Sequence, residues 1–82
     1  MSKKLKLIWD FFGEDAKPIA EHHVVHLKEF ANNNQIPFYE SATKAINNNQ
    51  TIAFITIDEK NMIIVRDALK PHRGEWAETK LK

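Results

Sequence analysis

The sequence predicts a single small α+β domain in which two helices pack against one antiparallel sheet. Hydrophobic residues alternate with polar ones in some segments, as in strands, and recur every three to four residues in others, as in helices. Along the 82 residues these periods follow the order strand, helix, strand, strand, helix. Glycine, asparagine and proline separate the segments, as is typical of turns. The length corresponds to one domain, with an ordered core at about residues 5–70 and a tail at 71–82.

The first predicted strand covers residues 5–12 and ends at Gly13. Because the side chains of a strand point alternately to its two faces, this strand has one large apolar face and one mixed face. The apolar face carries Leu5, Leu7, Trp9 and Phe11, and the mixed face carries Lys4, Lys6, Ile8, Asp10 and Phe12. We expect the apolar face, including Trp9 and Phe11, to lie in the hydrophobic core.

The first and longest helix is predicted over residues 15–33. Asp15 is expected to cap its N-terminus through the carboxylate, and Pro18 fits the first turn. The asparagine run at 32–34 suits the left-handed conformation that ends many helices. A broad apolar stripe faces the core and consists of Ala16, Ile19, Ala20, Val24, Leu27, Phe30 and Ala31. His23 falls inside this stripe, so we expect a histidine at the core edge with one ring nitrogen hydrogen-bonded.

Two further strands and a second helix complete the pattern. The strand at 38–46 has a diluted apolar pattern that suits a sheet edge. A turn at 47–50 leads to the strand at 51–57, which is apolar on both faces.

The second helix is predicted over residues 59–69, with Asp58 as its N-cap and Pro71 after its end. Its core stripe is Met62, Val65 and Leu69, and two further apolar side chains, Ile63 and Ile64, lie off that stripe. The tail at 71–82 is compatible with a short fourth strand, with packing on a partner, or with partial looseness.

This order of elements resembles the ferredoxin-like α+β fold, a two-layer sandwich, over residues 5–69. A fourth strand in the tail would complete that fold. The resemblance implies an architecture and no activity, because this fold carries many unrelated functions. Trp9-Asp10-Phe11, the histidine-rich helix and residues 71–75 also resemble a family of small uncharacterised bacterial proteins, which implies no activity either.

Composition excludes several classes of function. The chain has no cysteine, which rules out disulfides, thiol nucleophiles and cysteine-ligated metals and is compatible with a cytoplasmic protein. The two glycines, Gly13 and Gly74, are too few for a phosphate-binding or dinucleotide-binding loop. Ser2 and Ser41 do not lie in a nucleophile elbow. A formal net charge of +1 and the absence of a long apolar segment indicate neither a nucleic-acid nor a membrane partner.

His22 and His26 are the candidate metal ligands. They stand four residues apart, so both imidazoles lie on one face of the helix, as in helical zinc sites. A third ligand would have to come from His72, from Asp10 or from another subunit. The alternative is that both are ordinary histidines on a solvated face. A divalent metal is the one cofactor that the sequence indicates.

Asp10, His72 and Arg73 are the candidate residues for binding a ligand or an anion. In the expected topology the end of the first strand and residues 71–75 meet at one end of the sheet. Arg73 could hold a carboxylate or phosphate with a forked pair of hydrogen bonds, and Asp10 could orient a histidine. The alternatives are cations placed favourably after a helix C-terminus and a surface aspartate.

The sequence indicates a homodimeric binding or assembly module without catalytic activity. The alternative is a small enzyme or metal-binding protein that uses histidines at the end of the sheet, with an unknown small-molecule ligand. The expectation of a dimer rests on the sheet face away from the helices, where Ile8, Phe12 and the third strand would expose an apolar patch. A second copy would cover it face to face. Pairing through the edge of the first strand is the other arrangement considered.

Overall fold

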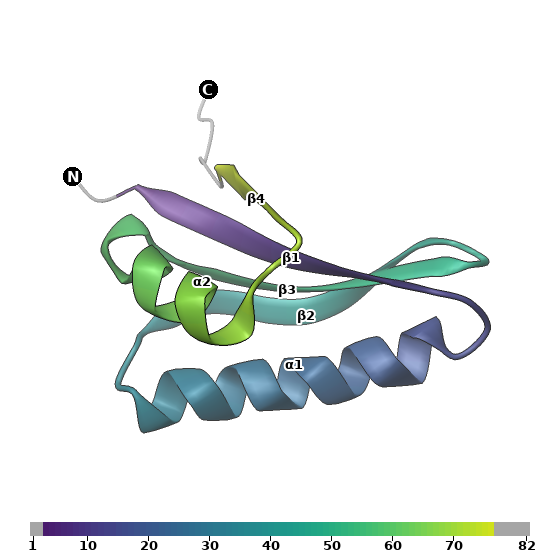
Figure 1. Cartoon of the computed structure of the whole chain (residues 1–82), viewed down its shortest axis with the longest axis horizontal. Coiled ribbons are helices and arrows are strands. Elements are labelled where there is room, and N and C mark those ends of the chain that lie inside the picture. The colour runs from purple at the N-terminus through teal and green to yellow at the C-terminus, as the bar shows by residue number, and fades with distance from the viewer. Residues whose placement is uncertain (1–2, 77–82) are drawn as a thin grey trace.

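The computed structural model describes residues 3–76, which form one four-stranded antiparallel sheet with two helices packed against it (Figure 1). The strand order is β2-β3-β1-β4. The elements are β1 (Lys4–Phe12), α1 (Ala16–Asn33), β2 (Phe38–Asn47), β3 (Gln50–Asp58), α2 (Met62–Leu69) and β4 (Arg73–Trp76). This arrangement confirms the predicted α+β class and has the element order and strand order of the ferredoxin-like sandwich.

The two central strands, β1 and β3, supply most of the core. They pair antiparallel along their full length, with Leu7 opposite Ile55 and Ile8 opposite Phe54. The odd-numbered side chains of both strands face the helices, as predicted for β1. The main core cluster on that side consists of Leu5, Leu7, Trp9, Leu27, Ala31, Ile36, Ile55, Ile57 and Val65.

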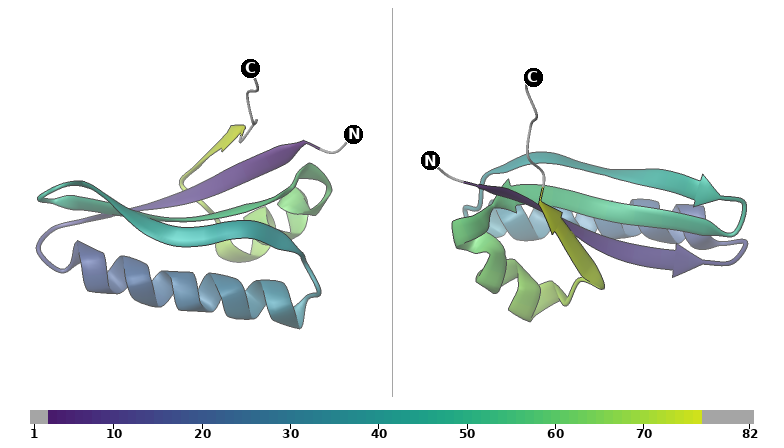
Figure 2. Two further views of the ribbon diagram at one scale, coloured as in Figure 1. Left: turned by 180° about the vertical axis from the view of Figure 1, so that it is seen from behind. Right: turned by 90° about the horizontal axis from the view of Figure 1, so that it is seen from above.

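Helix α1 lies along the length of the sheet (Figure 2). Its buried face is made largely of small residues, which allow the helix axis to approach the strands: Ala16, Ala20, Val24, Leu27 and Ala31. Ile19, predicted to lie in this stripe, is 50% exposed. The helix starts where predicted, but the Asp15 carboxylate accepts no capping bond from the described residues. The left-handed residue after the helix is Gln35, with φ of 57°, and not one of the preceding asparagines.

Strand β2 forms one edge of the sheet, as its composition predicted. Its pairing with β3 shifts register near each end, between Phe38 and Glu40 and between Ala45 and Asn47. The two strands are joined by a tight turn at residues 48–49. The ten residues of β2 therefore form a regular central stretch with a bulge on either side.

The second helical segment begins with a single 3₁₀ turn (Glu59–Asn61) before α2. The Asp58 carboxylate does not cap it from within the described chain; it accepts a hydrogen bond from the Tyr39 hydroxyl at 2.7 Å. Val65 is buried, whereas Ile63 and Ile64 are exposed, as expected from their position off the core stripe.

The beginning of the tail forms a short fourth strand, which was one of the three alternatives considered for it. β4 pairs antiparallel with the first half of β1, from Leu5 opposite Trp76 to Ile8 opposite Arg73. The remaining tail residues, 77–82, lie outside the described residues. Because β4 already occupies this edge of β1, the edge pairing between copies that we considered for β1 is not open over that half. No helix within residues 3–76 is long and apolar enough to span a membrane.

The sheet face opposite the helices differs from its prediction. We expected an exposed apolar patch, but Ile8, Ile52 and Phe54 are only 1%, 4% and 6% exposed in the single chain. Polar side chains help to cover them: the Lys6 ammonium lies 4.2 Å from the centroid of the Phe54 ring. Phe12, at the end of β1, is exposed as predicted. A dimer built sheet face on sheet face would therefore have little apolar surface left to bury.

Candidate functional site

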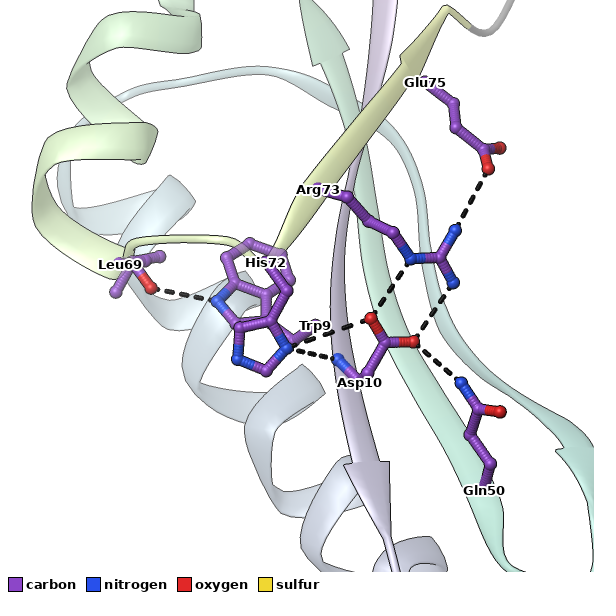
Figure 3. Close-up of polar contacts among 7 residues, drawn as sticks. All are labelled: Trp9, Asp10, Gln50, Leu69, His72, Arg73 and Glu75. Atoms are coloured by element: carbon purple, nitrogen blue, oxygen red, sulfur yellow. Dashed lines mark hydrogen bonds and ion pairs between the residues drawn. The ribbon is translucent and has the colours of Figure 1, made fainter.

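Asp10 is the centre of a polar network that joins three strands (Figure 3). Its side chain is only 13% exposed. Arg73 of β4 donates two hydrogen bonds to the carboxylate, from Nε to Oδ2 at 3.1 Å and from Nη2 to Oδ1 at 3.0 Å. Gln50 of β3 donates a third from Nε2 to Oδ1 at 3.0 Å. Arg73 Nη1 also donates to Glu75 Oε2 at 3.2 Å. One carboxylate of β1 thus holds side chains from both neighbouring strands.

His72 joins this network through the backbone of β1. The Asp10 N–H donates to His72 Nδ1 at 2.8 Å, and the His72 N–H donates to the Ile8 carbonyl at 2.9 Å. An acceptor at Nδ1 requires the ring proton to be on Nε2. The imidazole therefore accepts from the backbone N–H of Asp10. Asp10 lies two residues beyond Ile8, the last residue of β1 that pairs with β4. This protects the strand edge where β4 no longer covers it.

The charges of the network stabilise one another. The hydrogen bond from Arg73 is the main reason that the pKa of Asp10 lies below its ordinary value, and the bond from Gln50 acts in the same direction. Burial of the carboxylate opposes this shift. The pKa of Arg73 is raised above its ordinary value, chiefly by its hydrogen bond to Asp10. Both groups are therefore ionised near neutral pH.

The structure brings together the three residues predicted for a ligand or anion site, Asp10, His72 and Arg73. The forked donors of Arg73 hold the Asp10 carboxylate, so an external anion would have to displace it. Asp10 contacts the His72 ring through its backbone N–H, while Oδ2 lies 3.9 Å from Nδ1. The arrangement fastens β4 and the segment before it to β1. This geometry stabilises the attachment of β4 to the sheet. Anion binding by Arg73 stays a prediction.

His22 and His26, the candidate metal ligands, lie one turn apart on the exposed side of α1. Their Nε2 atoms are 2.9 Å apart, so one ring donates a hydrogen bond to the other. The expected third ligand does not join them: within residues 3–76 no group of three histidine, aspartate or glutamate side chains could hold a metal. A third ligand from His72 or Asp10 is therefore not found within the described residues, and one from another subunit stays a prediction.

His23 lies against the core, as predicted, but without the expected hydrogen bond. Its ring packs edge-on against Trp9 and Phe11, with centroid distances of 4.9 Å and 5.5 Å. Nε2 is buried and has no hydrogen-bond partner within the described part of the chain. Burial is the main cause that lowers the pKa of His23 below its ordinary value. The ring therefore behaves as a core side chain that carries one unsatisfied polar atom.

Sequence reasoning missed two members of the network, Gln50 and Glu75. Gln50 begins β3 opposite Phe12, and Glu75 lies opposite Lys6. Both positions become meaningful only when the pairing register places them on the same face as Asp10. A third unpredicted bond, from Trp9 Nε1 to the Leu69 carbonyl at 2.9 Å, ties the end of α2 to β1.

No family model, curated protein or solved structure matches this chain. The resemblance to small bacterial proteins is thus without a matching family, and the chain is assigned at the level of its fold.

Proposed function

We propose that this protein is a non-catalytic assembly module that forms a homodimer through the outer edge of β2. The supporting observation is the difference between the two edges of the sheet. At one edge lies β4, which is only four residues long, so the outer side that it leaves open is short; beyond its end the His72 ring accepts from the backbone of β1. At the other edge, the ten residues of β2 pair with β3 on their inner side and have no strand partner on their outer side among residues 3–76.

An open edge strand is a template for pairing with another chain, because its outward N–H and C=O groups need partners. Two of the exposed large apolar side chains lie on this strand: Tyr39 is 52% exposed and Ile46 is 45% exposed. Pairing of two copies at this edge would satisfy the backbone groups and continue the sheet. A small domain without disulfides commonly gains burial by such association.

Sedimentation equilibrium tests the proposal. Wild-type protein at micromolar concentration should show about twice the monomer mass of 9.5 kDa. Ile46→Lys, which places a charge on the β2 edge, should weaken the dimer. Ile63→Lys is the matched control, since Ile63 is similarly exposed but lies on helix α2 and not on the edge strand β2; it should leave the dimer intact. A mass near 9.5 kDa at all accessible concentrations would contradict the proposal.

The second candidate function is binding of a divalent metal by His22 and His26. The observation that favours it is the 2.9 Å separation of the two Nε2 atoms, which places two imidazole nitrogens side by side on one helix face. Titration of untagged protein with Zn²⁺, followed by calorimetry, should show one site per chain that His26→Ala removes. His23→Ala is the control, because the His23 ring faces the core. Equal heats from wild type and His26→Ala would exclude this site.

A further inference from the structure

The outer edge of β2 carries charges whose order is complementary to a second copy of the same strand. Glu40, Ala42 and Lys44 lie opposite residues of β3 that belong to the sheet face away from the helices. Glu40 and Lys44 therefore share one face and stand two positions before and two positions after Ala42. Both are exposed, and neither forms an ion pair with another residue of the described chain.

We propose that β2 pairs antiparallel with β2 of a second copy, about a two-fold axis that passes at Ala42. This inference rests on the proposed edge dimer and specifies its register. In an antiparallel pair that is symmetric about Ala42, Glu40 faces the partner's Lys44, and Lys44 faces the partner's Glu40. Opposite charges directly across two strands stabilise the pair. On the other face Ser41 meets the partner's Thr43, and hydroxyl pairs of this kind also stabilise sheets.

Neighbouring registers are less favourable. An axis at Glu40 would place two glutamates directly opposite each other, and an axis at Lys44 would do the same with two lysines, which is destabilising. An axis at Ser41 or Thr43 would place each charge opposite an uncharged side chain. Charges on an edge strand usually discourage pairing. Here their opposite signs discourage the shifted registers and favour the symmetric one.

The bulges of β2 define how far this pairing extends. The regular stretch from Glu40 to Ala45 lies between the two register shifts, beside Tyr39 and Ile46. In the register centred at Ala42, the regular pairing runs from Glu40 to Lys44 of each copy, and Tyr39 and Ile46 lie at the bulges that flank it.

Charge reversal tests the facing pair of Glu40 and Lys44. Glu40→Lys places like charges opposite each other twice in the dimer, as does Lys44→Glu. Each single variant should raise the dimer dissociation constant by about tenfold. The double variant should return to the wild-type value. An equimolar mixture of the two single variants should form a heterodimer, because every facing pair is then of opposite sign.

Cross-linking tests the register directly, and the chain's lack of cysteine makes the result simple to interpret. Ala42→Cys places two thiols directly opposite each other, close enough for a disulfide between copies. Ser41→Cys is the control, since its thiol would face the partner's Thr43 and lie about 7–8 Å diagonally from the second thiol. Under oxidation Ala42→Cys should form a covalent dimer on a non-reducing gel, and Ser41→Cys should not.

The outcomes separate this inference from the function on which it rests. If wild type is a dimer but Ser41→Cys links as readily as Ala42→Cys, the register is overturned and the edge dimer remains. If wild type is a monomer in sedimentation equilibrium, both are overturned. Heterodimer formation by the mixed charge variants, together with selective linkage at position 42, supports the register.

Discussion

The guanidinium of Arg73 and the carboxylate of Asp10 form a two-point hydrogen-bonded ion pair across β4 and β1, at 3.0 Å and 3.1 Å. The two residues are 63 positions apart in the sequence. Because β4 has only four residues and all of them are exposed, this pair is an important part of what holds it in place. The ion pair therefore helps to keep residues 73–76 paired with β1 as a strand of the sheet.

Removal of the Asp10 carboxylate should destabilise the protein. Asp10→Ala leaves Gln50 without its acceptor and leaves Arg73 with only its bond to Glu75. We expect the free energy of unfolding in urea to fall by about 1–2 kcal/mol, a value reduced by the partial exposure of Arg73. Arg73→Lys should also destabilise, because an ammonium cannot form the forked pair. Arg66→Ala is the control, since Arg66 pairs only with its neighbour Asp67 among the described residues, at the surface. An equal loss in the control and in Asp10→Ala would contradict a specific role for the pair.

The same carboxylate should make part of the stability dependent on acid pH. The pKa of Asp10 is lowered from its ordinary value of 3.8 in the folded protein, chiefly by Arg73. The unfolded chain therefore takes up a proton at this position at a higher pH than the folded protein does. The stabilisation is complete above the ordinary pKa and is lost as the pH falls through it towards the lowered value. The difference in unfolding free energy between wild type and Asp10→Asn should thus be smaller at about pH 3 than at about pH 7. A constant difference would show that ionisation of Asp10 does not contribute.

Replacement of His23 should stabilise the protein. His23→Leu removes the buried Nε2 that has no partner within residues 3–76 and keeps an apolar side chain against Trp9 and Phe11. We expect a gain of about 1 kcal/mol near neutral pH from thermal or urea unfolding. A loss of stability would indicate that the imidazole contributes packing that leucine cannot replace.

The gain from His23→Leu should grow in mild acid. The pKa of His23 is lowered in the fold from 6.5, first by burial and then by the charges of His26, His72 and His22. The unfolded chain therefore binds a proton here that the folded protein resists, so wild-type stability decreases as the pH falls below 6.5. The leucine variant has no titrating group at this position, so its stability lacks this dependence on pH. If the unfolding free energies of the two proteins changed in parallel with pH, the prediction would be contradicted.

Anion binding at Arg73 can be tested by releasing its donors. In wild type an added phosphate must compete with Asp10, so it should raise the melting temperature only as much as in Arg73→Ala. In Asp10→Ala the forked donors lose that acceptor, and phosphate should stabilise this variant more, in proportion to its concentration above the dissociation constant. The double variant Asp10→Ala, Arg73→Ala should lose the extra shift. A larger shift in wild type than in Arg73→Ala would instead show that an anion displaces Asp10.

The sequence alone determined the elements of this protein and the face that each presents to the core. Alternation along β1 placed Trp9 inside, and the period of α1 placed Ala20 and Leu27 against the sheet, because these patterns depend on local backbone geometry. The turn signals at Gly13 and around Asn48 set the boundaries of the strands to within one residue. Even the meeting of Asp10 with residues 72 and 73 followed from the order of the elements, since that order allows few topologies.

Only the tertiary structure decided what the polar side chains do. Whether Arg73 holds an external anion or Asp10 depends on the register between β4 and β1, which no local pattern reveals. The covering of Phe54 by Lys6, and the lack of a hydrogen-bond partner for His23 Nε2 in the described chain, depend likewise on neighbours that are distant in sequence. Local periodicity reports which face is apolar. The contacts of a polar group depend on the positions of several strands at once, and these are established only when the whole sheet is assembled.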